Sequence, residues 1–64
     1  MAKAKAVRVL LIDDHPLLRR GVATLINNDD IFEVCGEISV PRKAVAAVRV
    51  KEPDVVVLDL TFEG

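Results

Sequence analysis

The chain has 64 residues, a formal net charge of −1 and 52% hydrophobic residues, which makes it one small domain and excludes a general binder of polyanions. The single cysteine, Cys35, excludes an internal disulfide, and with the single histidine it cannot make a structural zinc site. Since small domains bury only about 60% of the surface that their unfolded chains expose, we expect this apolar chain to pack against a copy of itself or to belong to a larger domain.

The N-terminal part of the chain is predicted to be a disordered tail over 1–6, followed by a buried strand over 7–12. The apolar run from Val9 to Ile12 is rich in branched side chains and is typical of a strand buried on both faces. It is too short for a signal peptide, and no run approaches the roughly 20 apolar residues of a membrane span. We therefore expect a soluble, cytoplasmic protein without membrane contact.

A helix follows this strand. Pro16 suits a first turn, where its missing N–H is no loss, so Asp14 or His15 is expected at the N-cap. We interpret His15 as this turn and cap residue rather than as a metal ligand or phosphate-transfer group, and Arg19 and Arg20 as a solvated face. The apolar residues that recur at helical spacing are Leu18, Val22, Leu25 and Ile26.

The segment 32–37 alternates between two sets of side chains and predicts an edge strand with one solvated face. One face of this strand would carry Phe32, Val34 and Gly36. The other face would carry Glu33, Cys35 and Glu37. Since no base or cation adjoins Cys35 in the sequence, we interpret it as an apolar filler of this strand.

The last two predicted elements are a second helix and a second buried strand. Pro41 suits the start of the helix, and Glu52 and Pro53 end it because the residue before a proline avoids the α region. The apolar run 55–58 has the signature of a fully buried strand, closed by Asp59. The apolar face of the helix would comprise Ala44, Ala47 and Val48.

The order strand, helix, strand, helix, strand contains two βαβ units and predicts an α/β fold with a parallel three-stranded sheet. In the order 2-1-3, the first and third strands are neighbours about 4.8 Å apart. The third strand then needs neighbours on its faces and its outer edge, so the chain reads as the first half of an α/β domain. Without those neighbours, we expect a homo-oligomer through the exposed sheet edge.

Carboxylates follow two of the buried strands: Asp13 and Asp14 the first, Asp59 the third. Taken singly, each acid is more typical of a helix cap or turn. Ligands of open parallel sheets, however, bind outside the carboxyl ends of the strands, so we expect the three acids in one pocket. Mg²⁺ takes oxygen ligands, so its binding would offset the repulsion between these carboxylates. The backbone carbonyl of Thr61 is a further candidate ligand. A carboxylate beside Mg²⁺ can act as a nucleophile toward phosphorus.

Three segments carry a resemblance to response-regulator receiver domains, CheY-like domains, and most of all to their NarL/FixJ-type subgroup. Residues 9–22, VLLIDDHPLLRRGV, closely resemble the opening of that domain. Residues 32–37, FEVCGE, resemble its second strand, and 52–60, EPDVVVLDL, resemble its third strand with the phosphoacceptor aspartate. The resemblance runs over 7–64, nearly the whole chain, and covers the first half of a receiver domain.

This resemblance implies a flavodoxin-like fold and a role in a two-component phosphorelay. Asp59 would accept phosphate from the phosphohistidine of a sensor histidine kinase. Asp14 and Asp59 would bind Mg²⁺ directly with the Thr61 carbonyl, and Asp13 would contribute through water. Receivers of this subgroup usually precede a helix-turn-helix domain, so the whole protein would regulate transcription and bind DNA through a C-terminal domain that this chain lacks. The chain itself would not be an enzyme.

The chain departs from the family pattern after the acceptor, where Asp-Leu-x-Met-Pro-Gly is usual. Phe62 and Glu63 replace Met and Pro, and Glu63 adds negative charge near the pocket. The switch Ser/Thr and the Lys of the later strands are absent, so we expect the metal cluster without the switch. Two alternatives are a half-domain whose only activity is self-association, and a haloacid-dehalogenase-type phosphatase, which would need an aspartate where Thr61 stands.

Overall fold

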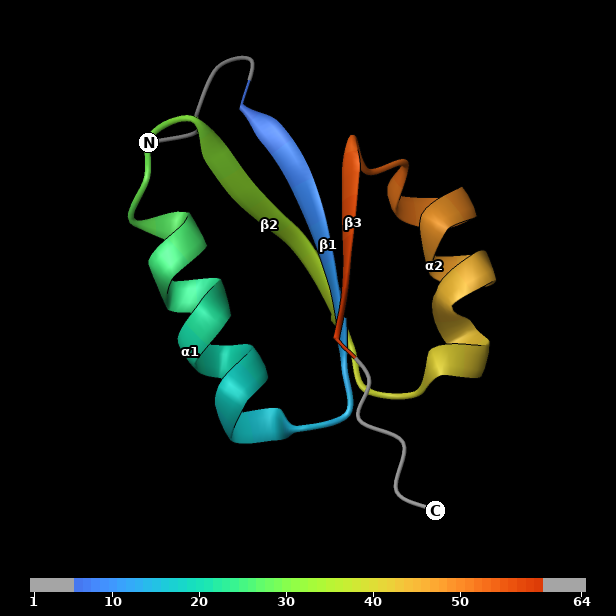
Figure 1. The fold of residues 1–64 in the computed structure, drawn as a ribbon. Coiled ribbons are helices and arrows are strands. Elements are labelled where there is room, and N and C mark those ends of the chain that lie inside the picture. The colour runs from blue at the N-terminus through green and yellow to red at the C-terminus, as the bar shows by residue number, and fades with distance from the viewer. Residues whose placement is uncertain (1–5, 60–64) are drawn as a thin grey trace.

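The computed structural model describes residues 6–59, and it confirms a parallel three-stranded sheet with one helix on each face (Figure 1). The strand order is β2-β1-β3, as predicted. Most of the tail over 1–6 and the residues Thr61, Phe62 and Glu63 lie outside the described residues. The elements are β1 (Val7–Asp13), α1 (Pro16–Asn27), β2 (Phe32–Ile38), a 3-10 turn (Pro41–Lys43), α2 (Ala44–Lys51) and β3 (Val55–Asp59).

The central strand β1 forms the core of the fold. Its apolar run is buried as predicted, and Leu10 is fully enclosed. On the side of α1, Val9 and Leu11 pack with Ala23, and partly buried side chains from α1 and β2 surround them. Burying side chains of this size stabilises a fold by about 1.5–3 kcal/mol each. This burial holds the end of β1, where the acids lie, in a fixed place.

The face of α1 that meets the sheet differs from the predicted one. Val22 and Ile26 pack on the core, and Ala23 is buried, but Leu18 and Leu25 are exposed. The small side chain of Ala23 allows close approach of the helix to the sheet. Arg19 and Arg20 of α1 form ion pairs with Glu37 of β2, which orient this side of the helix toward the sheet. The prediction was therefore wrong for Leu18 and Leu25.

The edge strand β2 contains a bulge that changes which face its side chains take. Val9 is opposite Val34, but Leu10 is opposite Gly36, so Cys35 is an extra residue in the ladder. Beyond the bulge, Glu37 lies on the α1 side with the arginines of that helix. The predicted division into faces was therefore wrong after Cys35, because one extra residue reverses the alternation.

The same bulge turns Gly36 toward α2. A Cβ atom at Gly36 would lie 3.0 Å from Cδ1 of Leu10 and 3.6 Å from Cε of Lys51, so glycine allows the close approach of α2 to the sheet. Every residue of β2 is half-buried, because helices contact both of its faces. The solvated face predicted for this strand was therefore wrong.

Arg8 fixes the end of α2 and the start of β3 against β1. Its guanidinium donates hydrogen bonds to the carbonyls of Lys51 and Glu52, where Glu52 ends the helix in the left-handed region with φ 48°. The backbone N–H of Arg8 donates to Asp54 Oδ2 at 2.9 Å, and the N–H of Asp54 donates to the Arg8 carbonyl at 2.8 Å. These bonds set β3 in parallel register beside β1.

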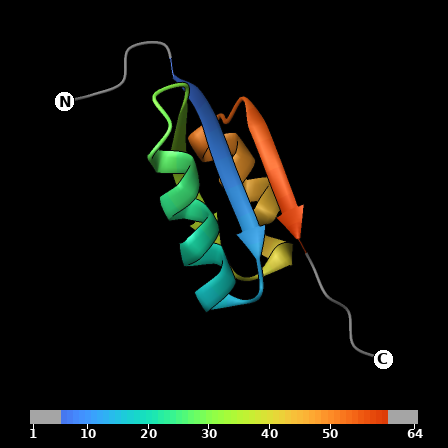
Figure 2. The ribbon, with the colours of Figure 1, turned by 60° about the vertical axis from the view of Figure 1, so that its left-hand side comes forward.

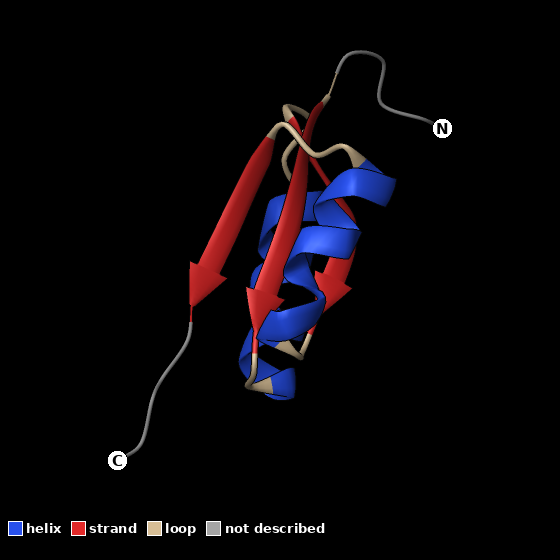
Figure 3. Cartoon of the chain, turned by 90° about the vertical axis from the view of Figure 1, so that its right-hand side faces the viewer, coloured by secondary structure: helices blue, strands red, loops and turns tan. Residues whose placement is uncertain are grey.

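The outer strand β3 is exposed, in contrast to the prediction of a fully buried strand. Its four apolar residues, 55–58, are each between 39% and 60% exposed. Among the described residues, β3 pairs only with β1, and its other edge faces outward (Figures 2 and 3). The apolar run is suited to a strand with two neighbours, and the described residues supply one.

Candidate functional site

The parallel sheet brings the acids to one edge of the molecule. All three strands run in the same direction, so their carboxyl ends lie together (Figures 2 and 3). Asp13 is the last residue of β1, and the register sets its backbone opposite that of Asp59 at the end of β3. Asp13 is buried, at 5% exposed, while Asp14 lies exposed in the turn that leads to α1. The site therefore combines one enclosed carboxylate with one open to solvent.

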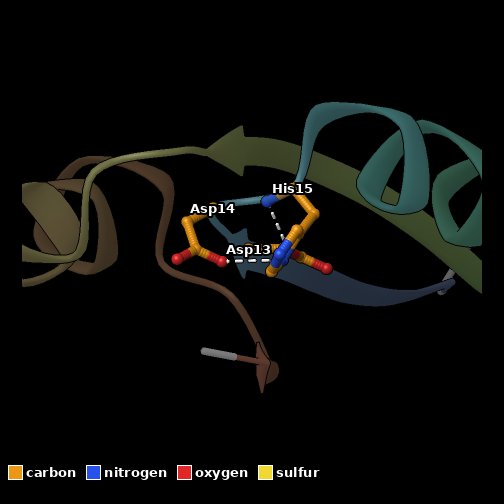
Figure 4. A group of neighbouring side chains, drawn as sticks. All are labelled: Asp13, Asp14 and His15. Carbon is orange, nitrogen blue, oxygen red and sulfur yellow. Dashed lines mark hydrogen bonds and ion pairs between the residues drawn. The ribbon is translucent and has the colours of Figure 1, made fainter. Parts of the chain in front are cut away.

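His15 contacts both carboxylates of the pair (Figure 4). Its backbone N–H donates to Asp13 Oδ1 at 2.8 Å, and its ring Nδ1 lies 2.9 Å from Asp14 Oδ1 and 3.5 Å from Asp13 Oδ1. The N-cap residue of α1 is His15, one of the two residues predicted for this position, but its side chain makes no capping hydrogen bond. Sequence reasoning missed this contact, although the position directly after the acid pair was a signal for it.

Arg19 ties the end of β1 to α1 and β2. Its guanidinium donates to the backbone carbonyl of Asp13 at 3.1 Å and to Glu37 Oε1 at 3.2 Å. Arg20 donates to the other oxygen of Glu37 at 2.9 Å. The side chain of Arg19 is only 15% exposed, whereas that of Arg20 is 72% exposed. The solvated face predicted for these arginines was therefore wrong for Arg19, and Arg20 is exposed but paired.

The chemistry of the donor atoms fits a hard divalent cation. One ligand atom each from Asp13, Asp14 and His15 lies within 4.8 Å of the others, and two of these donors are carboxylate oxygens. Mg²⁺ prefers oxygen ligands and is usually held by one or two carboxylates together with water. Asp59 joins this edge through its backbone register with Asp13. Thr61, the remaining predicted ligand, lies outside the described residues.

An apolar surface of α1 adjoins this acidic edge. Beginning at His15, it continues along the outward side of the helix, and one of its members, Val22, also packs on the core. Its apolar members are Leu17, Leu18, Gly21, Val22 and Leu25. Among residues 6–59, no helix has the length and apolar character needed to cross a membrane.

Comparison with known proteins gives a consistent result. The family model described as the response regulator receiver domain matches residues 9–64. A nitrate/nitrite response regulator protein homolog of Haemophilus influenzae is 45% identical over 58 residues, which is 91% of this chain and 28% of that protein. The transcriptional regulatory protein LiaR of Bacillus subtilis is 41% identical over 91% of the chain and 28% of its own length.

The nitrate/nitrite response regulator protein NarL of Escherichia coli is 38% identical over all of this chain and 30% of its own length. The chain thus spans less than a third of the length of each of these relatives. Other matches include protein-glutamate methylesterases, whose similarity to this chain covers 15% of their length.

Proposed function

Since the chain belongs to the response regulator receiver domain family, we propose that it binds Mg²⁺ at the acidic edge and accepts a phosphoryl group on Asp59. The observation that carries this proposal is the parallel register, which sets Asp59 opposite Asp13 and beside the turn that holds Asp14. The ends of β1 and β3 thus lie side by side at this edge, and the register supports a shared site for the three acids. Family membership supports the role in a two-component phosphorelay.

Each acid has a distinct part in this proposal. Asp14 and Asp59 would hold Mg²⁺ directly with the carbonyl of Thr61, and Asp13 would contribute through water. When bound, Mg²⁺ offsets the negative charge of the phosphoryl oxygens. A carboxylate oxygen of Asp59 forms a bond to phosphorus as the bond from phosphorus to the donor nitrogen breaks, which leaves an aspartyl phosphate and a free histidine. The chain is thus a phosphoacceptor and not an enzyme.

The partners of the whole protein are proposed from the relatives alone, because the chain spans only 28–30% of the length of the relatives described above. A sensor histidine kinase would supply the phosphoryl group. A C-terminal domain outside this chain would bind DNA and regulate transcription, which agrees with the name of one relative, the transcriptional regulatory protein LiaR. With these two partners, the protein would act in the cytoplasm.

The test of the site is covalent modification of the purified chain by acetyl phosphate with and without Mg²⁺. We expect a mass gain of about 80 Da, one phosphoryl group, that requires Mg²⁺ and is lost in Asp59→Asn. Asp54→Asn is the matched control, because Asp54 lies at the opposite end of β3. Equal phosphorylation of Asp59→Asn and the wild type would contradict the assignment of the acceptor.

A second candidate function is self-association through β3. The specific observation is that the outward edge of β3 has no neighbouring strand among the described residues. The strand is also apolar and uncharged over Val55, Val56, Val57 and Leu58, which are 39–60% exposed. Strands of this kind pair with other chains. Sedimentation of the 64-residue chain would then show a dimer. The substitution Val56→Lys in β3 is expected to disrupt this dimer, whereas the control Val50→Lys, on the exposed side of α2, is expected to leave it intact. A monomer at high concentration excludes this function.

A further inference from the structure

The side chain of His15 has a position that neither packing nor helix capping explains. It is half-exposed, so it adds little to the core. It occupies the N-cap of α1, yet it gives the helix no side-chain hydrogen bond. Its ring instead turns back toward the acid pair, where Nδ1 lies 2.9 Å from Asp14 Oδ1 (Figure 4).

A donor at this place has a physical consequence for Asp14. A carboxylate only accepts hydrogen bonds, so a ring nitrogen at this distance serves as an N–H donor. Among the described residues, no other side chain forms a hydrogen bond or ion pair with Asp14, which lies in a turn open to solvent. The His15 ring is therefore the group that restricts the rotation of this carboxylate. It engages Oδ1 and leaves Oδ2 available to a ligand.

Hydrogen-bond partners of metal-binding carboxylates fix their orientation, and loss of such partners typically weakens metal binding by about 10–100-fold. We infer that His15 is a positioning residue of the cation site. Its Nδ1–H holds Asp14 Oδ1 so that Oδ2 serves the cation, while its backbone N–H holds Asp13. This inference rests on the proposed function, because it requires that the acid pair binds a divalent cation.

Three substitutions of His15 separate the hydrogen bond from other roles. In His15→Asn, the amide nitrogen is as many bonds from the backbone as Nδ1, so the donor is kept without the ring. His15→Leu has the same branching at Cγ and no donor. His15→Ser supplies a good helix N-cap, but its hydroxyl is one bond too short to stand in for Nδ1. The serine variant thus isolates the contribution of the cap.

The affinity for Mn²⁺ is the readout, measured from the electron paramagnetic resonance signal of the free ion and followed by displacement with Mg²⁺. The chain has no tryptophan or tyrosine, so this readout replaces intrinsic fluorescence. Thermal unfolding of each variant without metal gives the stability separately. Because the ring is half-exposed, we expect the low end of the range, about tenfold weaker binding in His15→Leu and His15→Ser. His15→Asn is expected to bind close to the wild-type affinity.

The outcomes distinguish this inference from the proposed function. Wild-type affinity in His15→Leu, or an affinity in His15→Asn as weak as in His15→Leu, would overturn the positioning role. A nitrogen coupling in the spectrum of bound Mn²⁺ would show that the ring is a direct ligand and would also overturn it. In both cases, weaker Mn²⁺ binding in Asp14→Asn would still support the proposed cation site at the acid pair. No Mn²⁺ binding by the wild type would overturn the cation site itself, and the inference with it.

Discussion

Replacing Arg19 with methionine is expected to destabilise the fold far more than the same change at Arg20. Both arginines pair with Glu37, but Arg19 is 15% exposed and Arg20 is 72% exposed. Methionine keeps the apolar stem of either side chain and removes only the charged group. The pair is therefore a matched comparison of an enclosed and an exposed arginine at one carboxylate.

The magnitude follows from the bonds that each arginine makes. Arg19→Met removes a charged hydrogen bond to Glu37 and another to the carbonyl of Asp13. Hydrogen bonds to charged groups contribute about 1.5–3 kcal/mol each, which is about 3–6 kcal/mol for the two. Solvent screening of this partly exposed pair lowers the expected total loss to about 2–3 kcal/mol. Arg20→Met removes one exposed ion pair, which contributes about 0–1 kcal/mol.

Urea unfolding followed by far-ultraviolet circular dichroism measures both changes in the free energy of unfolding. A double-mutant cycle of Arg19→Met with Glu37→Gln isolates the contact between them. Equal losses in the two arginine variants, or no coupling between Arg19 and Glu37, would refute the bulge at Cys35. Without that bulge, Glu37 would lie on the other face of the sheet.

Two further predictions concern the backbone that positions the site. Gly36→Ala is expected to destabilise the fold by about 1–3 kcal/mol, because the added methyl meets the enclosed Leu10 side chain. Gly21→Ala should stabilise α1 by about 1 kcal/mol, because nothing lies within 4 Å of the added methyl. If urea unfolding gave a change of the same sign for both glycine variants, the packing of α2 on Gly36 would be contradicted. Arg8→Met should accelerate amide hydrogen exchange in β3 more than in α1, and unchanged exchange in β3 would show that Arg8 does not hold that strand.

Local sequence patterns predicted the elements and their order but not all of their faces. The apolar run of β1 is buried as expected, because the helices and the neighbouring strands surround it. The spacing of Leu18 and Leu25 is equally regular, yet both lie on the outward side of α1. A helical period places residues on one side of a helix, but the packing partners decide which side meets the sheet.

The contacts that position the site depend on distant residues. Arg8 meets the end of α2 more than 40 residues later, and Arg19 meets Glu37 18 residues later. No local pattern marks such pairs. The bulge at Cys35 was also beyond reach, because the strand still alternates correctly as far as Val34. The opposition of Asp13 and Asp59 was predictable, since strand order and parallel direction alone set which residues meet.

The most direct test of the cation site is to locate a paramagnetic cation on the chain. Mn²⁺ titrated into the nitrogen-15-labelled chain broadens the amide resonances nearest to the bound ion. We predict that the amides of Asp13, Asp14 and Asp59 broaden first, while those of Phe32 and Val55, at the opposite ends of their strands, stay sharp. Broadening centred elsewhere, or equal broadening at both edges of the sheet, would contradict a cation site at the carboxyl ends of the strands.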